Sequence, residues 1–131
     1  MSNKLTIEEI NNIEFKRNQV YIANLGDDVV GSEQGGVRPV LILQNNIGNR
    51  RSPNLIVLPL TTKTSKKLLP THVLVTKEKY KGLSKDCIVL ADQLKTISKQ
   101  RITKPYPITI IKQEDMKKVE ESLKVSVALW D

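Results

Sequence analysis

Cysteine and histidine each occur only once in this chain of 131 residues, as Cys87 and His72. A single cysteine cannot form an intramolecular disulfide, and it suits a protein that stays in a reducing cytoplasm. A single histidine cannot supply an acid–base pair of histidines. With only scattered carboxylates beside them, these two residues give neither a zinc-ligand spacing nor the adjacent acidic pair of a two-metal site. We therefore expect no disulfide, no metal and no cofactor.

Aromatic residues and long apolar runs are also scarce. Aromatic side chains make up 4% of the sequence, which argues against a platform on which successive nucleic-acid bases stack. No apolar run approaches the roughly 20 residues needed to span a bilayer. The first residues are polar, and Glu8 and Glu9 add acidic charge, unlike a signal peptide. The sequence thus predicts a cytoplasmic protein that does not enter a membrane.

Positive charge, by contrast, is in excess, with a formal net charge of +7. This charge fits a nucleic-acid partner, an acidic protein partner, or a surface that is charged for solubility alone. The hydrophobic share of 39% and the charged share of 27% are typical of a globular protein. At this length we expect one domain with a modest core.

A glycine-rich loop leads directly into an apolar strand near the middle of the first half. Gly31, Gly35 and Gly36 allow positive φ angles and a close approach of backbone N–H groups to a ligand. Pro39 fixes the backbone after Arg38 and favours an extended Arg38. A permanent cation thus stands where a flexible loop meets a rigid strand. The spacing fits a phosphate site and fits an ordinary glycine turn equally well.

The hydrophobic pattern predicts several short strands joined by glycine- and proline-bearing loops, which is typical of a small β-barrel or sandwich. Pro59 lacks an N–H group and should lie at a bulge or a sheet edge. The connection 45–54 should be rich in turns, and 63–70 should be a basic loop containing Lys63, Lys66 and Lys67. Strands are expected over 20–25, 37–44, 55–60, 71–75, 87–90 and 93–97, with 101–103 as a further extension.

Two helices are predicted at the ends of the chain. Thr6 and Glu9 have the spacing of a capping box, so residues 6–13 form either a short helix or an ordered tail. Near the C-terminus, apolar residues recur every three or four positions and make one helical face over 113–129. That face comprises Met116, Val119, Leu123, Val127 and Trp130.

Several stretches occur in a characteristic order and spacing: 31–40, 44–50 with Ser52 and Pro53, 69–73, 92–101, and the helix around 119–129. In these stretches the sequence resembles the MazF/PemK family of toxin endoribonucleases, close to the MazF branch of Gram-positive bacteria. The likeness implies an α+β fold, namely a small SH3-like β-barrel of the CcdB/PemK type with a C-terminal α-helix. It also implies that residues 1–15 lie outside the family core as an N-terminal extension and that 16–131 form a single toxin domain.

The resemblance also implies an activity and partners. It predicts the toxin of a type II toxin–antitoxin system, which cuts single-stranded mRNA at a short sequence motif without a metal. Attack by the 2′-OH would leave a 2′,3′-cyclic phosphate and a 5′-OH. The family forms homodimers, and an acidic antitoxin of MazE type shares the RNA groove. Two alternatives stay open: a CcdB-like toxin that binds gyrase through its C-terminal helix, and an RNA-binding module without catalysis.

Catalysis is assigned by this resemblance to Arg38 and Thr61. A guanidinium is planar, always charged and rich in donors, so beside the scissile phosphate it stabilises the extra negative charge of the phosphorane. The Thr61 hydroxyl can hold a phosphate oxygen or orient the 2′-OH. Thr62 is the alternative if the register differs by one residue. A plain surface arginine paired with Glu33 is the structural alternative for Arg38.

Other residues match positions at which the family contacts RNA, although a solvated surface explains several of them equally well. Glu33 is expected to bind or position the loop rather than transfer a proton. His72 matches a non-catalytic position and should be packed or partly exposed. Asn18 and Gln19 depart from the usual Gly-Asp pair. The expected RNA-binding residues are Glu33, Gln34, Gly35, Thr62, Lys63, Cys87, Gln93, Lys95 and Thr96.

Overall fold

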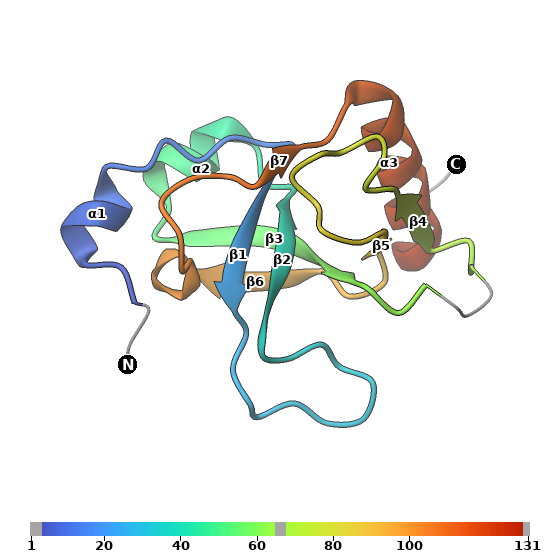
Figure 1. Cartoon of the computed structure of the whole chain (residues 1–131), viewed down its shortest axis with the longest axis horizontal. Coiled ribbons are helices and arrows are strands. Elements are labelled where there is room, and N and C mark those ends of the chain that lie inside the picture. Colours follow the sequence, from blue (N-terminus) through green and yellow to red (C-terminus); the bar gives the residue numbers. More distant parts are fainter. Residues whose placement is uncertain (1–3, 65–67, 130–131) are drawn as a thin grey trace.

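The computed structural model describes residues 4–64 and 68–129, so Lys66, Lys67 and Trp130 lie outside the described residues. Its strands form one curled antiparallel sheet in the order β4-β5-β3-β2-β1-β7, with β6 added to β3 (Figure 1). The elements are α1 (Ile7–Asn11), β1 (Gln19–Asn24), β2 (Val37–Ile42), α2 (Asn46–Arg51), β3 (Asn54–Thr61), β4 (His72–Val75), β5 (Cys87–Leu90), β6 (Lys95–Ser98), η1 (Lys99–Arg101), β7 (Thr109–Ile110) and α3 (Gln113–Val127). The expected α+β class, a small β-barrel with a C-terminal α-helix, is confirmed, and the sheet curls into a half-barrel.

Strand β3 is the centre of the sheet because it has three neighbours. It pairs with β2 on one side, while its other side pairs first with β6 over 54–57 and then with β5 over 60–61. Pro59 lies opposite Val40 of β2, between the end of the β6 ladder and the start of the β5 ladder. Its missing N–H therefore falls at a local edge, as its chemistry requires.

The two faces of this sheet bury two separate hydrophobic clusters. Along β3, Leu58 and Leu60 belong to one cluster, and Leu55 and Val57 belong to the other, which is the alternation of a strand buried on both faces. The first cluster packs under α3 through Met116 and Val119. The second includes the remaining members Phe15, Tyr21, Ala23, Leu25, Val40, Ile42, Ile97 and Ile102.

The terminal helices cover opposite ends of the molecule (Figure 1). The capping box of α1 is confirmed, because Glu9 N donates to Thr6 Oγ1 at 3.1 Å and Thr6 N donates to Glu9 Oε1 at 2.9 Å. Leu5 and Ile13, which flank α1, pack against the second cluster. Helix α3 carries the predicted apolar face, but Val127 is exposed because this face runs beyond the sheet. Residues 4–15 of the N-terminal extension are thus part of the fold.

Asp115 at the start of α3 is buried rather than solvated at the helix N-terminus. Tyr80 donates its hydroxyl hydrogen to Asp115 Oδ2 at 2.5 Å, and Lys79 Nζ lies 2.9 Å from the same carboxylate oxygen. Burial opposes ionisation, but these two contacts outweigh it and hold the pKa of Asp115 below its usual value. The turn after β4 is therefore tied to α3 through one carboxylate.

Three local predictions were wrong. The 45–54 connection contains α2, because Asn45 caps a short helix by accepting from Gly48 N at 2.9 Å. Residues 99–101 form a 3₁₀ turn, and only Ile102 bridges to Ala23 of β1. Gln93 precedes β6 in a turn. Short capped turns such as these carry no hydrophobic period, so pattern reading misses them.

Asn18 stands where the MazF/PemK family commonly has glycine, and its backbone shows the structural effect of this difference. Its φ angle is +82°, a left-handed conformation that glycine adopts without cost and that asparagine tolerates better than most residues. Its backbone still closes the turn, since Asn18 N donates to Ile42 O at 3.0 Å. The substitution thus preserves the geometry at the start of β1.

Candidate active site

Arg38 and Thr61 face one another across two neighbouring strands. Strands β2 and β3 are antiparallel with Val40 opposite Pro59, and continuing this register by two residues sets Arg38 opposite Thr61. Both side chains lie on the face of the second hydrophobic cluster. Arg38 is two residues before Val40 and Thr61 is four residues after Val57, and an even spacing keeps strand residues on one face. Directly opposed residues have Cβ atoms about 5 Å apart. The pair therefore shares one face of the sheet, beyond the last paired residues of β2 and β3.

The half-buried Arg38 guanidinium is held by the glycine loop. Its Nε donates to Gly35 O at 2.8 Å, and its Nη1 donates to Gln34 Oε1 at 2.5 Å and to Leu60 O at 3.5 Å. A guanidinium has five N–H donors in a fixed fork. The bonds to the protein engage Nε and Nη1, so Nη2 keeps donors for a bound anion. Arg38 is thus fixed in direction while it remains able to bind.

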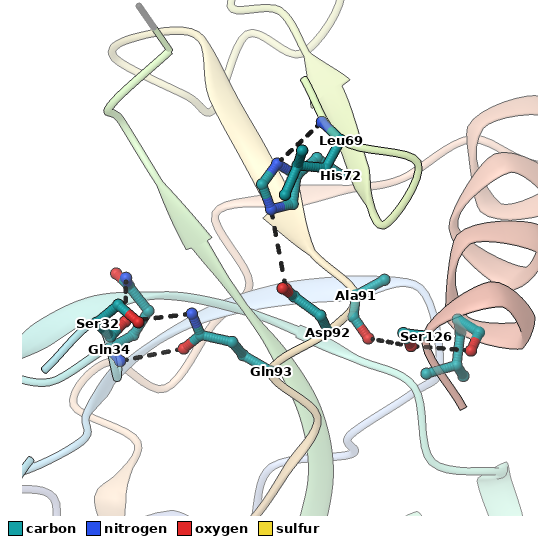
Figure 2. A network of polar contacts seen from close by, with 9 residues as sticks. Ser32, Gln34, Leu69, His72, Ala91, Asp92, Gln93 and Ser126 are labelled. Atoms are coloured by element: carbon teal, nitrogen blue, oxygen red, sulfur yellow. Dashed lines mark hydrogen bonds and ion pairs between the residues drawn. The ribbon is translucent and has the colours of Figure 1, made fainter. Parts of the chain in front are cut away.

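The loop is in turn clamped by the turn before β6 (Figure 2). Gln93 accepts from Gln34 N at 3.1 Å through Oε1 and donates to Ser32 O at 3.3 Å through Nε2. Lys95 Nζ donates to Gln34 O at 3.5 Å. Two side chains, 59 and 61 residues away in sequence, therefore determine where the loop places Gln34, and through Gln34 where Arg38 points.

That clamping turn is itself anchored from two sides (Figure 2). His72 Nε2 lies 3.9 Å from Asp92 Oδ1, while its Nδ1 accepts from Leu69 N at 3.4 Å. Ser126 of α3 donates from Oγ to Ala91 O at 2.9 Å. The single histidine is mostly buried in this position, so its geometry is that of a packed side chain that supports the turn.

A depression of about 410 Å³ opens between the loop and this turn. Ser32 and Glu33 line it from the loop, and residues 92–95 line it from the turn. The exposed Glu33 accepts from Val30 N at 3.0 Å, so its carboxylate closes the loop internally. The wall of the depression carries the cation Lys95 and the amide of Gln93 beside the carboxylates of Glu33 and Asp92, so it offers hydrogen-bond donors and acceptors.

Comparison with known proteins shows which family this chain resembles. The model of the PemK-like, MazF-like toxin of type II toxin–antitoxin systems matches residues 16–127. The chain belongs to this family. It is 51% identical to the endoribonuclease EndoA of Bacillus subtilis over 116 residues, which cover 88% of this chain and 97% of that protein.

Solved structures of the family have the same fold. An endoribonuclease from a mycobacterial species, solved with its cognate antitoxin, is 26% identical, with a TM-score of 0.69 over 88% of this chain and 98% of that one. MazF of Deinococcus radiodurans has a TM-score of 0.72 at 20% identity, over 89% of this chain and 99% of that one. The second likeness concerns the fold alone.

Most of the residues expected at the site of this MazF-like toxin lie together. Arg38, Gln34 and Gly35 contact one another, and Gln93 and Lys95 bind the loop. Thr62 and Lys63 follow Thr61 on the exposed surface, and Lys63 N donates to Thr61 Oγ1 at 3.3 Å. That bond directs the hydroxyl, although Thr61 itself is 8% exposed.

Two expected residues are not brought to this site. Cys87 is buried in the first hydrophobic cluster, where its thiol donates to Lys85 O, and burial raises the pKa of the thiol. Thr96 is exposed opposite Ile56, and it points to the other face of β6 from Lys95 and Ile97. The alternation of β6 separates Thr96 from the Arg38 side of the sheet.

Sequence reasoning missed the backbone contributors. The carbonyl oxygens of Ser32 and Leu60 accept from Gln93 and Arg38, and a carbonyl leaves no signature in the residue type. Within residues 4–64 and 68–129, no group of three His, Cys, Asp or Glu side chains is placed to hold a metal ion. Over the same residues, no helix is long and apolar enough to cross a membrane.

Proposed function

We propose that this MazF-like toxin is an endoribonuclease that cuts single-stranded mRNA at a short sequence motif without a metal. The observation that carries the proposal is the cross-strand placement of Arg38 opposite Thr61, with the guanidinium oriented by the loop. The 51% identity to an endoribonuclease over most of both chains supports it.

Arg38 supplies the electrostatic part of the reaction. Attack by the 2′-OH on the adjacent phosphorus makes a phosphorane with additional negative charge, and the leaving 5′-oxygen then departs to give a 2′,3′-cyclic phosphate and a 5′-OH. The fixed guanidinium donors stabilise this charge more strongly than they stabilise the ground state. The pKa of an arginine, above about 12, makes it a weak proton donor, so we assign Arg38 to charge stabilisation.

Thr61 and the loop position the RNA. The Thr61 hydroxyl accepts from Lys63 N, which leaves its hydrogen for a phosphate oxygen or for the attacking 2′-oxygen. Lys95 adds a cation, and Gln34, Gly35 and Gln93 present amide groups to bases and phosphates. Glu33, Thr62 and Lys63 lie at the exposed margins, where they would contact the RNA on either side of the cut.

The proposal extends to partners and location. We propose that the toxin works as a homodimer in the cytoplasm, where mRNA is found, and that an acidic antitoxin of MazE type competes with RNA for the same basic site. A mycobacterial member of the same fold was solved with its cognate antitoxin. Charge complementarity between an acidic segment and a chain of net charge +7 would speed their encounter.

The test is cleavage of a long mixed-sequence RNA in excess EDTA, with the 5′ ends mapped. Recurrent cuts by the wild type and a rate about 10²–10³ lower for Arg38→Ala would support the proposal, by analogy with loss of one oxyanion donor. Arg38→Lys keeps the charge but loses the planar fork, so it should recover little of the rate.

Other outcomes would reassign the function. RNA that is bound but left intact by the wild type would favour a passive RNA-binding module. Neither binding nor cleavage would favour a toxin that acts on a protein target, as CcdB-like gyrase toxins do. An Arg38→Ala rate equal to that of the wild type would remove Arg38 from the mechanism.

A further inference from the structure

A second, larger groove lies at the base of the β1–β2 loop, and it shares no lining residue with the depression. Its volume is about 1110 Å³, and it opens between α1, η1 and the loop ends of β1 and β2. We call it the flank groove. Lys4 and Leu5 of the N-terminal extension form one wall, Arg101 and Lys104 another, and Asn24 and Val37 the third. Since the family model begins at residue 16, one wall of this groove lies outside the part of the chain that the family shares.

The flank groove is basic with an apolar strip. Among its lining side chains, Lys4, Arg101 and Lys104 are cationic and Glu9 is anionic. Glu9 accepts from Thr6 N at 2.9 Å, so its charge is partly satisfied within α1. The partly buried Leu5 and the 63% exposed Val37 provide apolar surface in the same groove. Cations beside apolar surface suit a polymer with anionic groups along one edge and flat apolar groups along the other.

Arg101 is held in place for such a ligand. Its Nη1 donates to Asn24 O at 3.2 Å, and a Cβ atom at Gly26 would lie 3.3 Å from the same nitrogen. The guanidinium therefore rests against the base of the β1–β2 loop, and its other N–H donors make no further hydrogen bond within the described residues. An exposed arginine that is already ordered loses less conformational entropy on binding than a free one.

The flank groove and the active site are adjacent along β2. Val37 lines the flank groove, and the next residue, Arg38, lies in the active site on the opposite face of the strand. A ligand that occupies both must therefore pass around the base of the loop, which requires several nucleotides. The volume also exceeds the range of about 300–1,000 Å³ that is typical of small-molecule pockets. Both features favour a segment of a polymer over a metabolite.

We propose that the flank groove binds the phosphodiester backbone of the substrate RNA outside the cut motif, through Arg101 and Lys104. This inference rests on the proposed function, because it concerns the same RNA. An RNA already held at Arg38 presents its flank at a high effective concentration, and its phosphates and flat bases match the cations and the apolar strip of the groove. These contacts would give this toxin a preference for long RNA over short RNA.

The test compares two 2′-O-methyl RNAs, which cannot be cut by 2′-OH attack. One spans only the cut motif mapped above, or a short mixed sequence if none is found; the other adds about ten nucleotides on each side, within the site sizes of single-strand binders. Affinities are measured by fluorescence anisotropy over a range of salt concentrations. The variants are Arg101→Gln with Lys104→Gln, and Lys104→Gln alone, which leaves the Arg101–Asn24 contact intact. Lys81→Gln with Lys117→Gln, both exposed outside the groove, is the matched control.

We expect the double variant to bind the long RNA about tenfold more weakly, the loss of one or two charge-assisted contacts. The slope of affinity against salt should fall by about 1 to 2 for the long RNA. Binding of the short RNA should stay unchanged, and Lys104→Gln should show a smaller loss of the same kind. A structural role of Arg101 would instead weaken both RNAs together.

The proposal is overturned if long and short RNA lose affinity equally, or if the control variant loses as much as the double variant. It is also overturned if an oligoglutamate peptide, and not the long RNA, loses affinity in the double variant, since the groove would then hold an acidic peptide. Because binding is measured on uncleavable RNA, its result is independent of the cleavage assay. A wild type that binds long RNA through the groove but never cuts would refute the nuclease and leave the groove assignment standing.

Discussion

At the scale of single residues, the proposed reaction depends on the Thr61 hydroxyl group. Its oxygen accepts from Lys63 N, and its hydrogen is left for the RNA. We predict that Thr61→Val, which keeps the shape and removes the hydroxyl, lowers the cleavage rate by about 10²-fold, whereas Thr61→Ser retains most of it. The measurement is single-turnover cleavage with saturating enzyme, which separates chemistry from binding. Loss of the bond from Lys63 N should cost only about 1 kcal/mol of unfolding free energy, which urea titration checks. Equal rates for Val and Ser would show that the hydroxyl has no part in catalysis.

Residue-level reasoning singled out Arg38, because a donor-rich cation between a glycine loop and a strand fits a phosphate site, but it fits an ordinary glycine turn equally well. The catalytic role of Arg38 comes from the family resemblance and stays a prediction. The resemblance also places Cys87 near the RNA, whereas the structure buries it in the first hydrophobic cluster. All four residues of β5 are buried, so the strand has no alternation from which to tell which face each side chain takes. The placement of Thr96 could not be predicted for a different reason. Its strand does alternate, but only the fold shows which face of the sheet carries Arg38.

At the scale of elements, the loop from 27 to 36 depends on the turn that precedes β6. We predict that Gln93→Ala, which removes both bonds to the loop, accelerates amide hydrogen exchange at Gln34 and lowers cleavage by about tenfold. Exchange followed by mass spectrometry and cleavage under the same conditions provide the two readings. Gln113→Ala, at the exposed start of α3, is the control. Slower cleavage with unchanged exchange would show that Gln93 acts on RNA and not on the loop.

The link between the 76–83 turn and α3 should respond to high pH. Burial and the bond to Asp115 raise the pKa of Tyr80 to about 12, from 10.0 in the unfolded chain. Because the pKa of Tyr80 is higher in the folded chain than in the unfolded chain, its hydroxyl contributes fully to the unfolding free energy below pH 10. This contribution is lost as the pH rises towards 12. Tyr80→Phe removes the bonds to Asp115 and to Lys112 N, so we predict a loss of about 1–3 kcal/mol at neutral pH.

The sign of this effect is checked by the pH dependence. The difference in unfolding free energy between wild type and Tyr80→Phe should shrink between pH 10 and pH 12. Tyr21, whose pKa burial also raises to about 12, is present in both proteins and cancels. At low pH, the lowered pKa of Asp115 adds stability that is lost as the pH falls below about 4. A difference that stays constant from neutral pH to pH 12 would assign Tyr80 a packing role only.

Elements with a clear hydrophobic period were predictable, and those built by local caps or distant contacts were not. The 20–25 and 55–60 strands and the final helix follow from apolar spacing, and Pro59 from its missing N–H. Helix α2 depends on the side chain of Asn45 at its first turn. The clamp between Gln93 and the loop joins side chain to backbone across 59 residues, which no local pattern encodes.

At the scale of the whole molecule, one exposed apolar area remains beside the clamping turn. Leu94 is 45% exposed, and Val125 and Leu129 of the α3 end are 46% and 69% exposed. Ser126 binds Ala91 O at 2.9 Å, so the end of α3 lies against the turn that carries Leu94. Exposed apolar groups that gather near a site mark an interaction surface. A second copy that covered this area would also deepen the shallow depression into a groove that can hold RNA.

We therefore predict that the wild type sediments at low micromolar concentration with twice the 14.8 kDa mass of one chain. Val125→Arg places a charge in the apolar area while keeping a good helix former near the α3 C-terminus, where a cation is favourable, so it should shift the mass towards the monomer. Ile47→Arg, on the exposed face of α2, should leave the dimer intact. If dimerisation completes the groove, Val125→Arg should also lose affinity for RNA in proportion to the monomer formed. A monomeric wild type, or a dimer that Val125→Arg leaves unchanged, would show that this apolar area serves another partner, because the fold alone does not determine what covers it.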